Sequence, residues 1–169
     1  GGASRAPTVE LEDGRLLLPA YAAPEAGAKG VAYLAASDDA GVSWRFHAVM
    51  ADGNQAEEPF DCHEPFVLRT RAGRLYCFLR SYGGGGGRGK GGGLMRLCHS
   101  DDGGVTWSEP AETAVWGYPQ AAVELPDGRI VLAYGYRREP FGVRARLWDP
   151  DKEAVGEAPE TVLRDDGAG

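Results

Sequence analysis

Hydrophobic positions along the chain fall in short runs that alternate with polar residues and end at glycine, proline or aspartate. Such runs are typical of β-strands, and the spacing of an amphipathic helix is nearly absent. Four runs follow one another, and this set of four occurs three times. The pattern therefore predicts an all-β chain of three four-stranded units, which we place at residues 5–52, 60–116 and 117–165.

A Gly-Arg pair precedes the second apolar run of each unit, with the glycines at Gly14, Gly73 and Gly128. Two of these glycines follow an aspartate. Asp-Gly between apolar runs is a strong signal for a β-hairpin closed by a type I′ turn, in which both central residues need positive φ. We therefore expect the first two strands of each unit to pair through such a turn.

An octapeptide lies between the third and fourth runs of the first two units, as SDDAGVSW at 37–44 and SDDGGVTW at 100–107. Its aspartate and serine can accept hydrogen bonds from amides of their own turn, and its tryptophan can bury a large ring between strands. Calcium binding or catalysis by these carboxylates is the less favoured alternative. We expect a structural role for Ser37, Asp39, Gly41, Trp44, Ser100, Asp102, Gly104 and Trp107.

Both octapeptides fit Ser-x-Asp-x-Gly-x-Ser/Thr-Trp, which resembles the Asp-box, or BNR repeat, of the sialidase superfamily. The resemblance implies a β-propeller, in which four-stranded antiparallel blades surround a channel. We expect residues 1–169 to form a partial propeller of about three blades out of an expected six, with the remaining blades outside this sequence. The third unit departs from the pattern, reading WDPDKEAVG at 148–156, which weakens one hairpin.

The composition of the chain excludes some classes of binding partner. The net charge of −7 disfavours nucleic acid, and no apolar run reaches the length of about 18 residues that a membrane-spanning helix needs. Cysteines Cys62, Cys77 and Cys98 lack metal spacing, so we expect buried thiols and neither a metal nor a cofactor. The glycine-rich stretch 83–93 lacks the phosphate-loop pattern and is expected to be a mobile loop. The partner that the resemblance implies is a carbohydrate.

Propeller sites lie at the channel end of the inner strands. Glu64 and Tyr118 are expected to open inner strands, each directly before a proline, and Arg80 and Arg137 follow the second strands of the same units. Arg5, in the sequence RAP, resembles the Arg-x-Pro of the family's first blade. We therefore expect the glutamate, the tyrosine and the arginines to converge on one rim.

The resemblance also implies roles. Arginines bind the carboxylate of a sialic acid bidentately, and sialidases use a tyrosine nucleophile whose proton a neighbouring glutamate takes. On this basis Glu64 and Tyr118 are catalytic candidates, and Arg5, Arg80 and Arg137 are substrate-binding candidates. The family's acid/base aspartate is expected in the loop at 22–30, but this loop contains no aspartate, and its only acidic residue is Glu25. We therefore expect no turnover by this chain alone.

Three functions stay open. The first is a sialidase-like glycoside hydrolase that removes a terminal acidic sugar, which requires Glu64, Arg80 and Arg137 to share one pocket. The second is an exo-hydrolase of a neutral glycan such as an arabinan, which requires two carboxylates at a separation of about 5 Å or about 6.5–9.5 Å. The third is a non-catalytic carbohydrate-binding propeller, which arginines fully engaged in rim salt bridges would favour.

Overall fold

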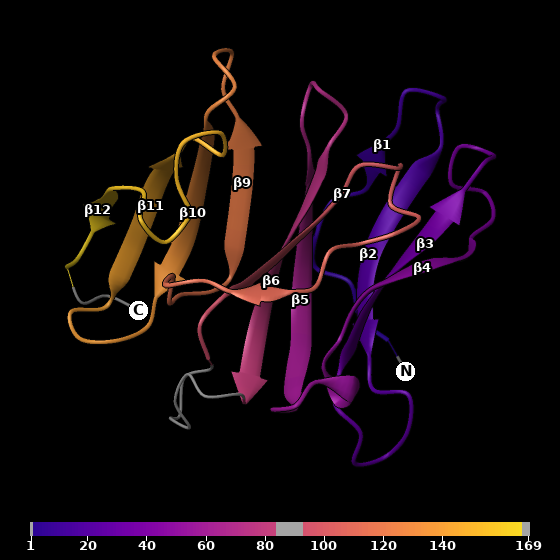
Figure 1. Cartoon of the computed structure of the whole chain (residues 1–169), viewed down its shortest axis with the longest axis horizontal. Coiled ribbons are helices and arrows are strands. Elements are labelled where there is room, and N and C mark those ends of the chain that lie inside the picture. Colours follow the sequence, from indigo (N-terminus) through magenta and orange to yellow (C-terminus); the bar gives the residue numbers. More distant parts are fainter. Residues whose placement is uncertain (1, 84–92, 167–169) are drawn as a thin grey trace.

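A computed structural model describes residues 2–83 and 93–166 of the chain (Figure 1). The first sheet contains β1 (Val9–Glu10), β2 (Leu16–Ala22), β3 (Val31–Ser37) and β4 (Arg45–Asp52). The second contains β5 (Phe60–Arg69), β6 (Leu75–Gly83), β7 (Arg96–Ser100) and β8 (Ala111–Glu112). The third contains β9 (Gln120–Glu124), β10 (Ile130–Tyr136), β11 (Gly142–Trp148) and β12 (Glu160–Arg164). The 3₁₀ turn Gly53–Gln55 joins the first two sheets.

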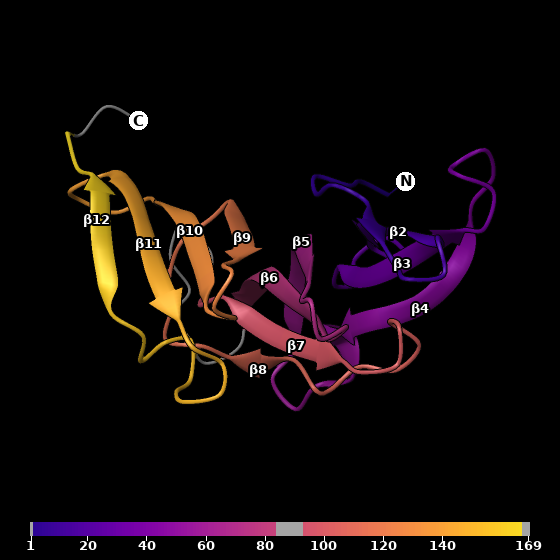
Figure 2. The same cartoon turned by 90° about the horizontal axis from the view of Figure 1, so that it is seen from above.

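Each sheet is antiparallel, with its strands in chain order. Seen from above, the three sheets follow one another around an arc, with β5 and β9 on its concave side and β4 and β8 on its convex side (Figure 2). The all-β prediction and the three four-stranded units are therefore confirmed. Most of the glycine-rich stretch, residues 84–92, lies outside the described residues. Within the described residues, no helix is both long and apolar enough to cross a bilayer.

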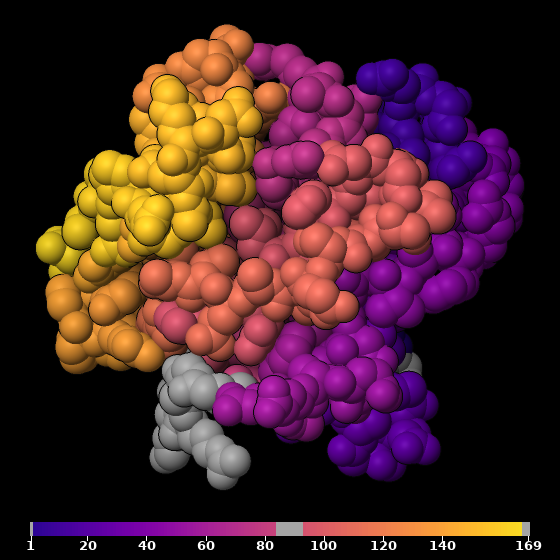
Figure 3. Space-filling model, in the orientation of Figure 1, coloured from indigo at the N-terminus to yellow at the C-terminus, as the bar shows by residue number. Residues whose placement is uncertain are grey.

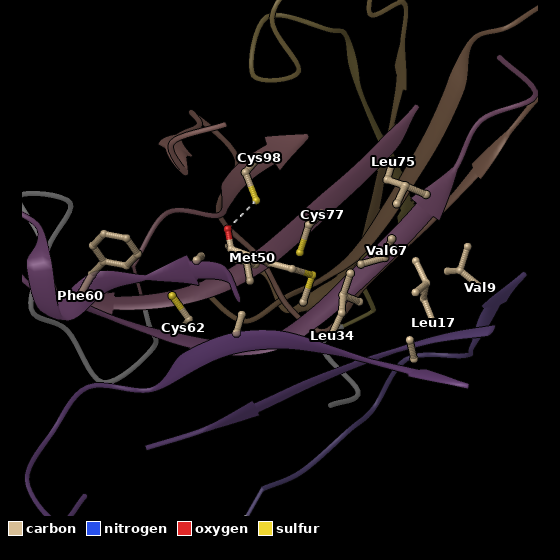
Figure 4. Packing of buried hydrophobic residues seen from close by; sticks show 14 residues of the cluster. Val9, Leu17, Leu34, Met50, Phe60, Cys62, Val67, Leu75, Cys77 and Cys98 are labelled. Atoms are coloured by element: carbon tan, nitrogen blue, oxygen red, sulfur yellow. Dashed lines mark hydrogen bonds between the residues drawn. The ribbon is translucent and has the colours of Figure 1, made fainter. Parts of the chain in front are cut away.

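Two apolar interfaces hold the arc together. Leu17 and Leu34 of the first sheet pack against Leu75 and Cys77 of the second, where all four side chains are fully buried (Figure 4). On its other face, β6 packs against the third sheet. Because β6 is covered on both faces, its sequence is a continuous apolar run rather than an alternating one. The second interface is formed by Tyr76, Phe78, Ile130, Leu132 and Trp148.

Cys62, Cys77 and Cys98 are free and buried, in agreement with the expectation of small buried thiols. Cys62 lies on β5 and Cys77 is paired across the sheet with Cys98. Burial raises the pKa of Cys62 to about 12 and that of Cys77 well above its ordinary value. Because the thiolate is the reactive form, burial disfavours reaction at Cys62 and Cys77.

The outward faces of the first and third sheets have no neighbour among the described residues, and these sheets form the two ends of the space-filling view (Figure 3). Large apolar side chains are exposed there: Phe46 by 65% on the first sheet, and Val123 by 55% and Leu147 by 38% on the third. A middle blade of a propeller has both faces covered, as the second sheet does. The two end sheets therefore each have one face that a middle blade would bury.

The turns between the first and second strands differ from the type I′ prediction. Gly14, Gly73 and Gly128 have φ of +84°, +90° and +88°, but the residue before each of them does not have positive φ. In the first turn, the Leu11 amide donates to the Arg15 carbonyl (2.9 Å) and the Gly14 amide donates to the Leu11 carbonyl (3.1 Å). This is a three-residue loop with a left-handed glycine. It needs only one residue with positive φ, so Ala72 fits where a type I′ turn would disfavour it.

The octapeptide turns satisfy their own polar groups. In the second copy, the Asp102 carboxylate accepts hydrogen bonds from the Thr106 amide (2.9 Å) and hydroxyl (2.6 Å). The Ser100 hydroxyl donates to Asp102 (2.8 Å) and accepts from the Gly104 amide (2.9 Å), while the Trp107 indole donates to the Gly104 carbonyl (3.0 Å). These hydrogen bonds, the side-chain bond from Thr106 first, lower the pKa of Asp102 to about 2.

The first copy makes the equivalent bonds, and hydrogen bonds from Ser43 lower the pKa of Asp39 to about 2. Its tryptophan differs from the expectation of a buried ring, because Trp44 is 39% exposed. Trp107 instead packs against the core between the first and second sheets. The cause is position in the arc: the second turn abuts the first sheet, whereas no described sheet lies beyond the first turn.

The Gly-Arg pairs and the octapeptides, separate in sequence, meet in space. Arg15 Nε lies 2.9 Å from an Asp38 carboxylate oxygen, and Arg74 binds Asp101 through Nε (2.6 Å) and Nη2 (2.9 Å). The first aspartate of each octapeptide therefore ties the two turns of its sheet together. In the third sheet, which lacks the octapeptide, Arg129 pairs instead with Asp127 of its own turn.

Candidate functional site

Glu64 lies at the end of the sheet opposite the octapeptide turns. It does not open a strand as expected, because β5 begins four residues earlier at Phe60. The pairing of β5 with β6 shifts register between His63 and Phe66, and Glu64 has a φ of +47°. Such bulges re-aim side chains, and a glutamate in the left-handed region is uncommon. Gln120 of the third sheet holds this bulge, since its side-chain amide donates to the Glu64 carbonyl (2.8 Å).

Two arginines face the Glu64 carboxylate, which is 9% exposed. Arg5 Nη1 lies 3.2 Å from one oxygen, and Arg80 Nη1 lies 3.1 Å from the other. Arg5 is 67% exposed, whereas Arg80 is 20% exposed. The three groups together carry one excess positive charge in a chain of net charge −7. This local excess favours an anionic ligand over a cationic one.

Tyr118 is buried beneath the Arg80 guanidinium. The Cζ atom of Arg80 lies 3.7 Å from the centroid of the Tyr118 ring and 4.7 Å from that of Tyr82. Arg80 therefore contacts two aromatic rings and a carboxylate at once, in the arrangement of a cation–π interaction. Its Nε is buried and has no hydrogen-bond partner among the described residues. The surroundings fix the position of Arg80 before any ligand arrives.

Arg137 reaches the Tyr118 ring from the third sheet, with its Cζ atom 5.0 Å from the centroid. It is exposed and forms no ion pair with any residue that the structure describes. Arg137 and Tyr118 both line an open cleft of about 470 Å³, together with Phe141 and Arg164. The neighbouring Arg138 lies instead over the Trp116 ring, at 4.0 Å. The guanidinium of Arg137 is therefore available to a ligand.

His63 lies beside this cluster, paired across the strands with Arg80. Its ring meets Tyr21 and Tyr82 edge to face, with centroid distances of 5.2 Å to each. Its Nε2 atom lies 3.9 Å from an Asp61 carboxylate oxygen. Burial, the largest cause, and the charge of Arg80 lower the pKa of His63, although Asp61 and Glu64 oppose this shift. The net shift of the pKa favours the neutral imidazole.

A family model describing a BNR repeat-like domain matches residues 2–153. The chain belongs to this family. No curated protein matches it. As a BNR repeat-like domain, the chain has its Asp-box turns at one end of the sheets and the Arg5–Glu64–Arg80–Tyr118–Arg137 cluster at the other. Within the described residues, no group of His, Cys, Asp and Glu is arranged to hold a metal ion.

Solved structures share the fold. A Dyadobacter fermentans protein of unknown function is 32% identical, with a TM-score of 0.82 over 98% of this chain and 43% of that protein. An α-L-arabinanase of Penicillium chrysogenum in complex with arabinobiose is 22% identical (TM-score 0.70; 92% of this chain, 49% of that one). The NanB sialidase of Streptococcus pneumoniae is 18% identical (TM-score 0.61; 93% and 23%). The chain thus has a sialidase-type propeller fold and spans less than half of each of these proteins.

All five site candidates from the sequence lie in one continuous set of contacts, but Glu64 and Arg80 are not among the residues that line the cleft at Tyr118 and Arg137. Sequence reasoning missed Gln120, which holds the Glu64 backbone, and assigned no site role to Tyr82, which covers Arg80. Gln120 is a polar residue at the start of an apolar run, and this break in the pattern was the available sequence signal. In the structure its side chain is 7% exposed. Glu25, from the loop expected to carry the acid/base group, is exposed.

Proposed function

We propose that this rim binds a terminal acidic sugar as part of a sialidase-like glycoside hydrolase. The observation that supports the proposal best is Arg137, which lines the cleft, has no ion-pair partner in the described part of the chain, and lies over Tyr118 beside the Arg5–Glu64–Arg80 cluster. A guanidinium offers a carboxylate two parallel N–H donors. The excess positive charge of the cluster adds a preference for an anionic sugar over a neutral one.

The proposal assigns catalysis to Tyr118 and Glu64. The phenolic oxygen attacks the anomeric carbon, its proton passes to the Glu64 carboxylate, and the bond from that carbon to the leaving oxygen breaks. A general acid outside this cluster protonates the leaving oxygen, and water then hydrolyses the glycosyl-tyrosine intermediate. Arg80 contacts both the carboxylate and the tyrosine ring, so it positions the two groups relative to each other.

Paired sugars test the proposal. The 169-residue chain is titrated with methyl α-N-acetylneuraminide and with arabinobiose. The protein encoded by the complete open reading frame is then assayed on fluorogenic derivatives of both sugars. We expect the chain to bind the acidic sugar more tightly than arabinobiose. We also expect the protein encoded by the complete open reading frame to hydrolyse the sialoside, and residues 1–169 alone to show no turnover. Preferential binding and turnover of the arabinoside would favour the neutral-glycan hydrolase. Binding without turnover by the open reading frame would favour a binding module.

The matched variants are Arg137→Gln and Arg138→Gln, which remove adjacent exposed guanidinium groups. Hydrogen bonds between charged groups contribute about 1.5–3 kcal/mol, so Arg137→Gln should weaken binding of the acidic sugar about tenfold or more. Arg138→Gln should leave it unchanged, since Arg138 lies over Trp116 instead. Equal effects of the two variants would contradict a specific carboxylate contact at Arg137.

A further inference from the structure

His63 has no part in the ion pairs of the cluster, yet it lies directly before Glu64 and opposite Arg80. Its side chain is 34% exposed, so a ligand can reach the imidazole. The Glu64 carboxylate is already engaged with Arg5 and Arg80. A neutral imidazole beside them is a different kind of group, because one of its nitrogens can accept a hydrogen bond.

Aromatic neighbours hold the His63 ring in place. Tyr21, at the end of β2, meets it at an interplanar angle of 61°, and Tyr82, on β6, meets it at 88°. Edge-to-face pairs are favourable at centroid distances of about 4.5–7 Å. Because the two tyrosines come from different sheets, the packing of the first sheet on the second fixes the direction in which the imidazole points.

Asp61 influences which nitrogen of the His63 ring carries the proton. The Asp61 carboxylate is itself anchored, since it accepts a hydrogen bond from the Gly30 amide (2.8 Å) and lies 3.3 Å from Lys29 Nζ. One of its oxygens is 3.9 Å from Nε2 of His63. A nearby carboxylate favours the tautomer with the proton on the nitrogen that faces it. At 3.9 Å this is an electrostatic contact and not a hydrogen bond, and a proton on Nε2 leaves Nδ1 as an acceptor.

We propose that His63 is a further substrate-binding residue of this rim, whose Nδ1 accepts a hydrogen bond from a hydroxyl of the bound sugar. Tyr21 and Tyr82 flank it and offer apolar surface to the C–H groups of the same sugar ring. The residue recognises the hydroxyl pattern, whereas Arg137 recognises the carboxylate. This inference rests on the proposed carbohydrate-binding function and deepens it.

The first test is an NMR titration of the 169-residue chain, following the ring signals of its three histidines as methyl α-N-acetylneuraminide or arabinobiose is added. His47 and His99 are internal controls, because their ring nitrogens lie next to the Gly103 carbonyl (3.3 Å) and the Ser108 hydroxyl (3.1 Å). We expect saturable shifts of the His63 signals and constant signals from the other two.

The second test compares His63→Phe with His99→Phe. Phenylalanine keeps a ring between the tyrosines but removes the acceptor, and a neutral hydrogen bond contributes about 0.5–1.5 kcal/mol, so the dissociation constant should rise about two- to tenfold. His99→Phe should not change it. His63→Gln keeps a polar group and provides a second variant if the phenylalanine variant fails to fold, as judged by circular dichroism. It should restore part of the affinity.

The outcomes separate the two proposals. If the chain binds the acidic sugar and Arg137→Gln weakens binding, but the His63 signals and variants have no effect, the inference about His63 is wrong and the proposed function stands. If His63 shifts with arabinobiose alone, His63 contacts sugar but the acidic-sugar proposal is wrong. If neither sugar moves any signal, both proposals are overturned.

Discussion

Asp102 and Glu64 are both carboxylates of the second sheet, at opposite ends of it, and their hydrogen-bond partners have different origins. Every partner of Asp102 lies within four residues of it along the chain. Glu64 is held by Arg5 from the start of the chain, by Arg80 from the next strand, and through its carbonyl by Gln120 from the third sheet. One carboxylate belongs to a turn and the other to an assembly of three sheets.

This difference decides what each carboxylate can do. The oxygens of Asp102 accept bonds from the Thr106 amide and hydroxyl and from Ser100, which leaves little capacity for a ligand. Asp39 has the same arrangement. Glu64 meets guanidinium groups that a ligand can share, and Tyr118, which contacts Arg80, lines an open cleft. Changes at the two ends of the sheet should therefore separate stability from ligand chemistry.

The largest expected effect is on catalysis. Glu64→Gln keeps the shape of the side chain but removes the proton acceptor and the negative charge between Arg5 and Arg80. Because general base catalysis contributes about 10²- to 10⁴-fold, sialoside turnover by the complete open reading frame should fall by that factor. Asp102→Asn is the control and should leave turnover unchanged. Normal turnover by a folded Glu64→Gln protein would remove Glu64 from the mechanism.

A smaller effect is expected on stability at the other end. Asp102→Ala removes the acceptor for the Thr106 and Val105 amides, and loss of a comparable cap costs about 1 kcal/mol. The free energy of unfolding, measured in urea, should fall by about this amount. Asp39→Ala should have a smaller effect, since Trp44 in its turn is exposed. Asp149→Ala, in the turn that lacks the octapeptide, should have the smallest, and an equal loss in all three would contradict the local account.

The smallest effect is a change with pH. The pKa of Asp102 is lowered from 3.8 to about 2 in the folded chain, so its contribution to stability is complete above about pH 4 and disappears as the pH falls through about 2. The melting temperature of the wild type should therefore approach that of Asp102→Asn over this range. Parallel melting curves from pH 4 to pH 2 would show that the carboxylate has no special partners in the folded state.

Much of this architecture follows from short-range pattern. The strands alternate or run apolar as their burial requires, and the Asp-box turns close with partners from their own eight residues. The meeting of Glu64, Arg80, Tyr118 and Arg137 was predictable from repeat phase, because equivalent positions of adjacent blades lie on the same rim. The type of the Gly-Arg turns was not predictable from Asp-Gly alone, since a three-residue loop with one left-handed glycine satisfies the same signal.

What the amino-acid sequence determined by itself is the class of fold, the family and the end of the sheets at which to look for a site. Only the tertiary structure decided that Glu64 lies in a bulge, that Gln120 supports it from another sheet, and that Trp44 is exposed while Trp107 is partly buried against the core. The reason is the range of the interactions. A turn or a strand satisfies its polar groups with near neighbours, whereas the charge balance at Glu64 and the burial of an aromatic ring depend on which sheet packs alongside.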